Sequence, residues 1–172
     1  MRIFTYGLSA ASAFFLISCT HDSVYGDARN TVPVSAAVAI AEDGAGGYLF
    51  SYNAPFADEK GNFDFSQKGA AFNNIKLTFT IADGSVEGIK FKPDAADAMW
   101  IVEKINVDET SGSPRGPYRG KQFSDFTISE DGKSLTVTDA NDDGVIYRYG
   151  LRFDLGGKTV IDDPDVNNGP KN

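Results

Sequence analysis

The chain has 172 residues and a formal net charge of −8, from 24 acidic and 16 basic side chains. An acidic surface repels phosphate, so this composition argues against nucleic-acid binding and against adsorption to anionic lipid through charge. One cysteine excludes an intrachain disulfide, and one histidine leaves too few residues for the usual zinc and copper sites.

The first 18 residues have the pattern of a secretory signal peptide. Arg2 supplies a positive start, and residues 3–18 carry no charge. The uncharged run is short for a membrane-spanning helix, which needs about 20 apolar residues, and no basic cluster follows it. We therefore expect residues 1–18 to be a signal peptide that is removed.

The uncharged run ends with Leu16, Ile17, Ser18 and Cys19, an order that resembles the bacterial lipobox. The resemblance implies cleavage before Cys19, a diacylglyceryl group on its sulfur and acylation of the new amine. Two or three acyl chains hold a protein far more firmly than one. Thr20 stands where an Asp retains enteric lipoproteins at the inner membrane, which implies the outer membrane here. The alternative is an ordinary cleavage site beside a chance or buried cysteine.

A polar segment without periodicity, residues 19–31, follows the predicted cleavage site. Such a composition is typical of a flexible linker, so we expect a lipidated tether. The only histidine, His21, falls in this tether, which leaves the folded part without a Ser-His or Cys-His nucleophile. We expect one domain over residues 32–165 and a flexible tail over residues 166–172.

The domain shows strand-like alternation of apolar and polar residues. The alternation is clear over residues 75–81, 89–92, 126–138 and 145–153, and Asp-Gly or Gly-Gly turns separate the stretches. About eight or nine such strands at short spacing predict an antiparallel β-sandwich of Ig-like or Greek-key type. A small closed β-barrel is the alternative. Only residues 94–100 indicate a short helix.

The last 45 residues or so resemble the DP-EP proteins, a group of small bacterial β-proteins. The shared features are an Asp-Gly-Lys-x-Leu-x-Val hairpin, an Asp-x-Asn turn, and a closing Asp-Pro followed by Asn-x-Pro, although Gly169 stands where an acidic residue is expected. The resemblance implies a sandwich-like fold and no known activity. The matching residues are Asp131, Gly132, Lys133, Leu135, Val137, Asp139, Asn141, Asp163, Pro164, Asn168 and Pro170.

Residues 108–122 form a loop that is long for a compact domain, and loops of this length are usually functional or disordered. In an acidic chain this loop carries Arg115, Arg119 and Lys121 together with Tyr118. Arginine and tyrosine are common in contact surfaces, so we expect these four residues to bind an anionic ligand or an acidic partner. The alternative is a mobile, solvated loop.

Asp139, Asn141 and Asp143, followed by a glycine, match the start of a calcium-binding loop. The twelfth position is Gly150 instead of Glu, which excludes an EF-hand and leaves a looser Ca²⁺ site. The alternative is a hairpin turn, for which Asn, Asp and Gly are the expected residues. A second acidic group, Asp162, Asp163 and Asp165, would share a cation or form a solvated strand end.

Trp100 is the only tryptophan, between Met99 and Ile101. An exposed ring would stack on a sugar, whereas a buried ring would belong to the core.

Together these features predict a lipid-anchored cell-envelope protein acting as a non-catalytic binding or structural module. Its expected partners are the membrane through Cys19 and an envelope protein or a glycan. The alternative is a carbohydrate-binding module with a Ca²⁺ site. An enzyme would require an acidic cleft that contains a carboxyl group of raised pKa.

Overall fold

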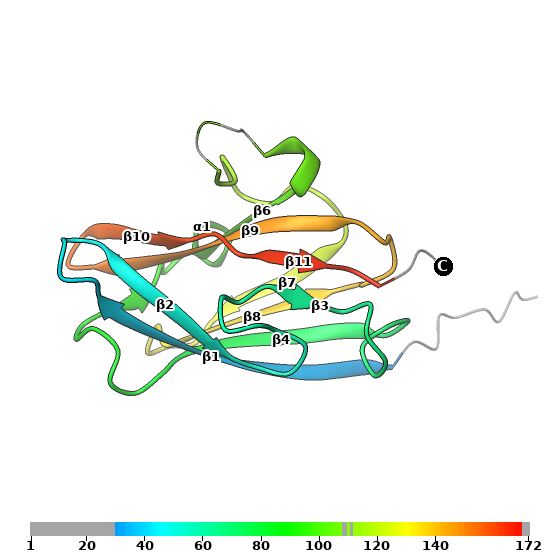
Figure 1. Cartoon of the computed structure of the whole chain (residues 1–172), viewed down its shortest axis with the longest axis horizontal. Helices are drawn as coiled ribbons and strands as arrows, with labels where there is room; N and C mark the ends of the chain where they lie inside the picture. Colours follow the sequence, from blue (N-terminus) through cyan, green and yellow to red (C-terminus); the bar gives the residue numbers. More distant parts are fainter. Residues whose placement is uncertain (1–29, 108–109, 111, 170–172) are drawn as a thin grey trace, which may run out of the picture.

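A computed structural model describes residues 30–107, 110 and 112–169. Eleven strands form two sheets that pack face to face, so the β-sandwich is confirmed (Figure 1). Among these residues both sheets end in edge strands, and the sheets therefore do not join into the closed barrel that was the alternative.

The first sheet has the order β2-β1-β4-β8-β7. β1 and β4 run parallel, with Val34 beside Leu77, and the other neighbours in this sheet are antiparallel. The parallel pair makes the sheet mixed and departs from the antiparallel pattern expected from the sequence. The strands are β1 (Thr31–Glu42), β2 (Tyr48–Asn53), β4 (Asn74–Ile81), β7 (Phe123–Ile128) and β8 (Ser134–Asp139).

The second sheet is built around the long strand β9, with β5 and β6 along one side and β10 and β11 along the other. The short β3 pairs with β11 in parallel. The strands are β3 (Phe63–Asp64), β5 (Lys90–Phe91), β6 (Met99–Glu103), β9 (Ile146–Leu155), β10 (Lys158–Asp162) and β11 (Asp165–Asn167).

β10 and β11 keep one register along β9 and are separated only around Pro164. Tyr149 N–H donates to the Pro164 carbonyl at 2.9 Å, but proline has no N–H to donate back. The ordered part extends beyond the boundary expected at residue 165, because β11 reaches Asn167 and both Asn168 and Gly169 are buried.

The core lies between the sheets and follows the alternation in the sequence. Ile75, Leu77, Phe79 and Ile81 of β4 are buried, as are alternate residues of β9. Phe79 contacts Tyr149 of the other sheet with ring centroids 5.7 Å apart. Burial of large aromatic side chains is the main stabilising contribution in a disulfide-free domain of this size.

Two short helices flank β6: α1 joins it to β5, and η1 lies between it and β7 of the first sheet. The helix α1 (Ala95–Ala98) begins at Asp94, whose carboxylate accepts a hydrogen bond from the Ala96 N–H at 3.0 Å. After β6, the 3₁₀ helix η1 (Lys104–Asn106) leads into the long loop above the second sheet (Figure 1). In the described part of the chain, neither helix has the length required to span a bilayer.

Candidate functional site

The long loop lies along the outer face of the second sheet. Pro114 is buried there, and the Arg148 guanidinium donates to the Gly112 carbonyl at 3.0 Å. Farther along, Pro117 forms a bridge with Trp100 of β6. The described residues 112–122 are therefore attached to the sheet at several points, although residues 108–109 and 111 of the predicted loop lie outside the described part.

A groove of about 420 Å³ lies between this loop and the edge of β6. Its size is within the range of ligand-binding sites in proteins. The loop forms one wall, while β6 and η1 form the other, and Tyr147 of β9 contributes to the lining. The lining residues are Ile101, Val102, Glu103, Asn106, Arg115, Gly116, Pro117, Tyr118, Arg119, Gly120 and Tyr147.

Three of the four loop residues singled out from the sequence line this groove. They are Arg115, Tyr118 and Arg119, and both arginines are exposed. Arg119 makes no ion pair with any described residue, whereas Glu103 on the opposite wall accepts a hydrogen bond from the Asn106 amide at 3.2 Å. Lys121, the fourth residue, is exposed but does not line the groove.

The two tyrosines of the groove are fixed by packing and hydrogen bonds. Tyr118 and Tyr147 both meet the Phe123 ring at nearly right angles, with centroids 5.2 and 5.0 Å away. The Tyr118 hydroxyl accepts from the Gln122 N–H at 2.9 Å, and the Tyr147 hydroxyl donates to Asp143 at 2.5 Å. Burial raises the pKa of both tyrosines, so they remain neutral donors or acceptors near pH 7.

The residues of the predicted Ca²⁺ loop form a hydrogen-bond network instead of an open cation site. Asn141 is fully buried with φ of 48°, and its oxygen accepts from the Gly169 N–H. Asp143 accepts from Tyr147 and from the Val145 N–H at 3.0 Å. The side-chain oxygens of Asn141 and Asp143 thus already accept hydrogen bonds from the protein, as the turn alternative would require.

Asp139 lies at the end of β8 and is 1% exposed. Its Oδ1 accepts from the Gln122 amide at 2.9 Å and from the Asn141 N–H at 2.8 Å, while Oδ2 has no hydrogen-bond partner. Burial raises the pKa of Asp139 to about 7, and the nearby Asp143 carboxylate acts in the same direction. Asp139 therefore titrates close to neutral pH.

The second acidic group is divided among different partners. Asp162 accepts from the Tyr52 hydroxyl at 2.5 Å, whereas Asp163 accepts from Ser113 of the loop. Asp165 pairs with Arg148 at 2.6 Å. Burial raises the pKa of Asp162 and of Asp163. At Asp165 burial also acts to raise the pKa, but the hydrogen bonds and positive charges of Arg148 and Lys104 together outweigh it, so the pKa is lowered.

A shallow pocket of about 310 Å³ contains both Asp162 and Asp163. Their partners belong to different elements, because Tyr52 is on β2 and Ser113 is on the loop over the outer face. Successive residues of an extended segment point to opposite sides. The two carboxyl groups therefore accept hydrogen bonds from different elements, although both residues line the pocket.

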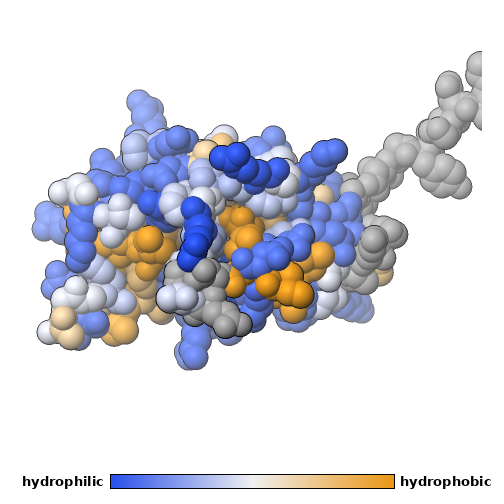
Figure 2. Space-filling model, turned by 90° about the horizontal axis from the view of Figure 1, so that it is seen from above, coloured by the Kyte–Doolittle hydropathy of each residue, from blue (hydrophilic) through white to orange (hydrophobic). Residues whose placement is uncertain are grey.

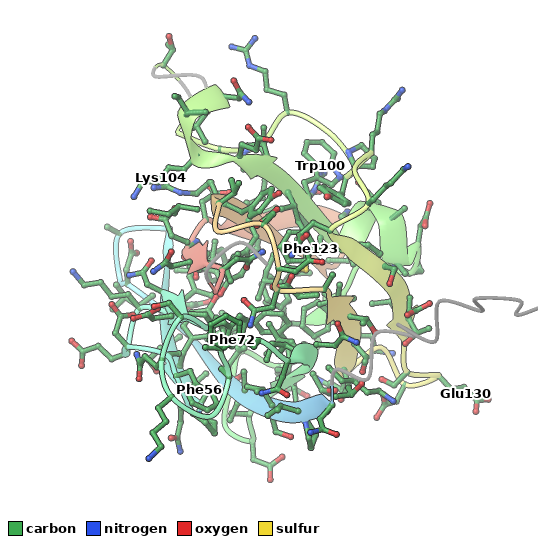
Figure 3. The ribbon with its side chains drawn as sticks, turned by 90° about the vertical axis from the view of Figure 1, so that its right-hand side faces the viewer. Phe56, Phe72, Trp100, Lys104, Phe123 and Glu130 are labelled. Carbon is green, nitrogen blue, oxygen red and sulfur yellow. The ribbon has the colours of Figure 1, made fainter. Side chains whose placement is uncertain are left out.

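Trp100 is half-buried beneath the loop, and Figure 3 shows it near the top of the molecule with Phe123 below it. The Arg152 guanidinium lies 3.5 Å from the ring centroid, which is a close cation–π contact. One face of this ring is thus covered by Arg152 and is not presented for stacking on a sugar.

Among the described residues, no group of three or more His, Cys, Asp or Glu side chains is arranged to hold a metal. Cys19, the predicted lipidation site, lies outside the described residues, as does Pro170.

Several residues of the site were missed by sequence reasoning. Tyr147 follows the alternation of β9 and therefore resembled a core residue, although its hydroxyl reaches Asp143. Gln122 and Asn168 bury their amides against Asp139, and nothing in their local sequence signals this contact. Glu103 lines the groove because β6 ends there, a boundary that the sequence did not define.

The comparisons with known proteins do not add a family. No protein-family model matches the chain, and no curated protein matches it significantly.

Proposed function

We propose that this chain is a lipid-anchored cell-envelope protein whose sandwich acts as a non-catalytic binding module. The lipobox-like sequence at residues 16–19 supports an acyl anchor on Cys19, and Thr20 supports an outer-membrane address. The polar segment up to residue 29 would let the domain reach away from the bilayer. The contact surface in this proposal is the groove between β6 and the loop.

The observation that carries the proposal is the position of Arg115, Tyr118 and Arg119. The sequence predicts that these residues form a contact surface, and all three line one groove. Arginine and tyrosine are enriched among the residues that dominate binding energies at protein interfaces. Their concentration in one hollow of an acidic protein favours a binding surface over a merely solvated loop.

A non-catalytic role agrees with the chemistry of the groove. Its two tyrosine hydroxyls are held by Gln122 and Asp143, and its single carboxylate, Glu103, has no second carboxylate beside it in the lining. The lining therefore offers positive charge, apolar surface and hydrogen-bond groups, but no paired acid and base.

In-cell crosslinking followed by affinity capture tests this function. The full-length wild-type chain is compared with Arg119→Glu and with Lys121→Glu, which makes the same charge change in the same loop outside the groove. We expect a crosslinked partner that is lost with Arg119→Glu and kept with Lys121→Glu. Equal recovery from all three proteins would refute a binding role for the groove.

A further inference from the structure

We propose that the groove binds an extended, acidic segment of a partner protein, which lies along the edge of β6 between η1 and the loop. This inference rests on the binding role proposed above and names the chemistry of the occupant.

The edge of β6 is suited to an added extended chain. One side of β6 pairs with β9 along its whole length, from Met99 to Glu103. On the other side, the only described pairing is the bridge from Trp100 to Pro117, and no described strand pairs with residues 101–103 there. An edge of this kind can take up an extended peptide through main-chain hydrogen bonds.

The charges on the loop favour carboxylates in that peptide. Arg115 and Arg119 line the groove and are exposed, whereas Lys121, farther along the same loop, does not line it. A guanidinium binds a carboxylate with two parallel hydrogen bonds, which is why arginine is preferred at such contacts. Glu103 on the opposite wall can accept from backbone or side-chain donors of the same segment.

An apolar side chain is also expected in the partner segment. Ile105 of η1 is 89% exposed, next to the groove residue Asn106, and Pro117 of the loop is exposed as well. Figure 2 shows apolar surface interrupted by strongly polar residues on this side of the molecule. Burial of an exposed isoleucine contributes to binding in the same way as burial in a core.

A polysaccharide fits these observations less well than a peptide. Trp100 has one ring face covered by Arg152, and the rings of Tyr118 and Tyr147 pack on Phe123. These aromatic side chains serve packing, whereas the exposed groups are arginines, a proline and an isoleucine. The combination of cations, apolar side chains and a strand edge that pairs with no described strand over residues 101–103 matches a protein segment.

The test is a selection of displayed random peptides of about 12 residues, long enough to cover β6 at roughly 3.3 Å per residue. The bait is the full-length chain in detergent, as wild type, Arg119→Glu, Arg119→Gln or Lys121→Glu. Wild-type bait should enrich peptides that combine Asp or Glu with an apolar residue. Binding of the enriched peptides should fall at least about tenfold with both Arg119 variants and stay within about twofold with Lys121→Glu.

Enrichment of neutral or basic peptides, no enrichment over an empty support, or insensitivity to Arg119 would overturn the proposal. Retention of polygalacturonate by the wild type but not by Arg119→Glu, without peptide enrichment, would overturn it in favour of an anionic polysaccharide. In that case, or if the crosslinked partner presents a basic segment, the groove remains a binding site and only the occupant is wrong. If the wild type gave neither a crosslinked partner nor an enriched peptide, the binding function itself would be refuted.

Discussion

Asn168 donates a hydrogen bond from its amide to the Asp139 carboxyl group, with Nδ2 3.3 Å from Oδ1. Both side chains are buried, and neither Asp139 Oδ2 nor Asn168 Oδ1 has a hydrogen-bond partner among the described residues. The same amide also donates to Asp143 at 3.2 Å. One amide therefore bridges two carboxyl groups and ties the end of the described chain to β8.

The first prediction concerns the pH dependence of stability. The pKa of Asp139 is about 7 in the folded protein, against a usual value of 3.8. The stabilisation from its proton is complete below the unfolded pKa and is lost as pH rises through 7, by up to about 4 kcal/mol. Urea unfolding at pH 5 and pH 8 measures the larger part of this loss, about 3 kcal/mol.

Asp139→Asn is the control for this prediction, because the amide keeps the shape and remains neutral at every pH. The difference in unfolding free energy between the wild type and Asp139→Asn should change with pH, in the wild type's favour at pH 5. This comparison also removes the opposite contribution of Asp165, whose pKa is lowered. If the unfolding free energies of the two proteins changed with pH in parallel, the raised pKa of Asp139 would be contradicted.

The second prediction concerns Asn141. Its amide donates to the carbonyls of Phe65, Ala70 and Asn73, and its oxygen accepts from the Gly169 N–H. Asn141→Ala leaves these buried groups without partners and should cost about 2–4 kcal/mol. Asn141→Asp removes the donors and adds a buried charge, so it should cost more at pH 7. Denaturant unfolding measures both, and wild-type stability in either variant would refute this role.

The same geometry predicts no stabilisation by calcium. Because the oxygens of Asn141 and Asp143 already accept protein hydrogen bonds, millimolar Ca²⁺ should leave the melting temperature of the wild type unchanged, and EDTA should have no effect. A rise in melting temperature with Ca²⁺ that disappears in Asp143→Asn would instead support the cation site expected from the sequence.

Much of the fold could be predicted because alternation of period two is a local property. Ile75, Leu77 and Phe79 point inward as expected, and the Asp94 cap and short helix lie where the sequence placed a helix. The parallel pairing of β1 with β4 could not be read in this way. It depends on which strands become neighbours in space, and two strands with the same alternation can pair in either direction.

The candidate site can likewise be divided into a part that the sequence predicts and a part that depends on contacts between distant residues. The composition of the loop identified Arg115, Tyr118 and Arg119, which line the groove. The sequence leaves both a hairpin turn and a calcium site open for residues 139–144, because Asp, Asn and Gly serve turns and cation loops equally well. Only the buried donors around it, such as Gln122, distinguish the two cases, and these come from distant parts of the chain.

The third prediction concerns the membrane anchor and stands on the sequence alone. Cys19→Ser should abolish acylation and block cleavage before residue 19, so the variant should carry no acyl group and should retain residues 1–18. Thr20→Asp should keep the lipid but shift the protein toward the inner membrane. Mass spectrometry of the purified protein measures the acyl groups, and an unmodified Cys19 in the wild type would contradict the anchor.

The fourth prediction tests how the loop is held on the sheet. A Cβ added to Gly150 would lie 2.7 Å from Asp163 Oδ1 and 3.6 Å from Pro114 Cδ. Gly150→Ala should therefore push the Asp163 carboxyl group out of place, weaken its hydrogen bond with Ser113 of the loop, and lower stability by about 1–3 kcal/mol, as overpacking usually does. Because Trp100 pairs with Gly150 and lies beneath Pro117, its fluorescence should shift to the red.

Gly116→Ala provides the matched control in the same loop. Gly116 lines the groove, but a Cβ added there would meet no atom within 4 Å, and its backbone is not in the left-handed region. This variant should keep wild-type stability and tryptophan emission. If Gly150→Ala also behaved like the wild type, the loop would not depend on its contact with the sheet. If Gly116→Ala alone were destabilised, the open position described for Gly116 in the groove wall would be contradicted.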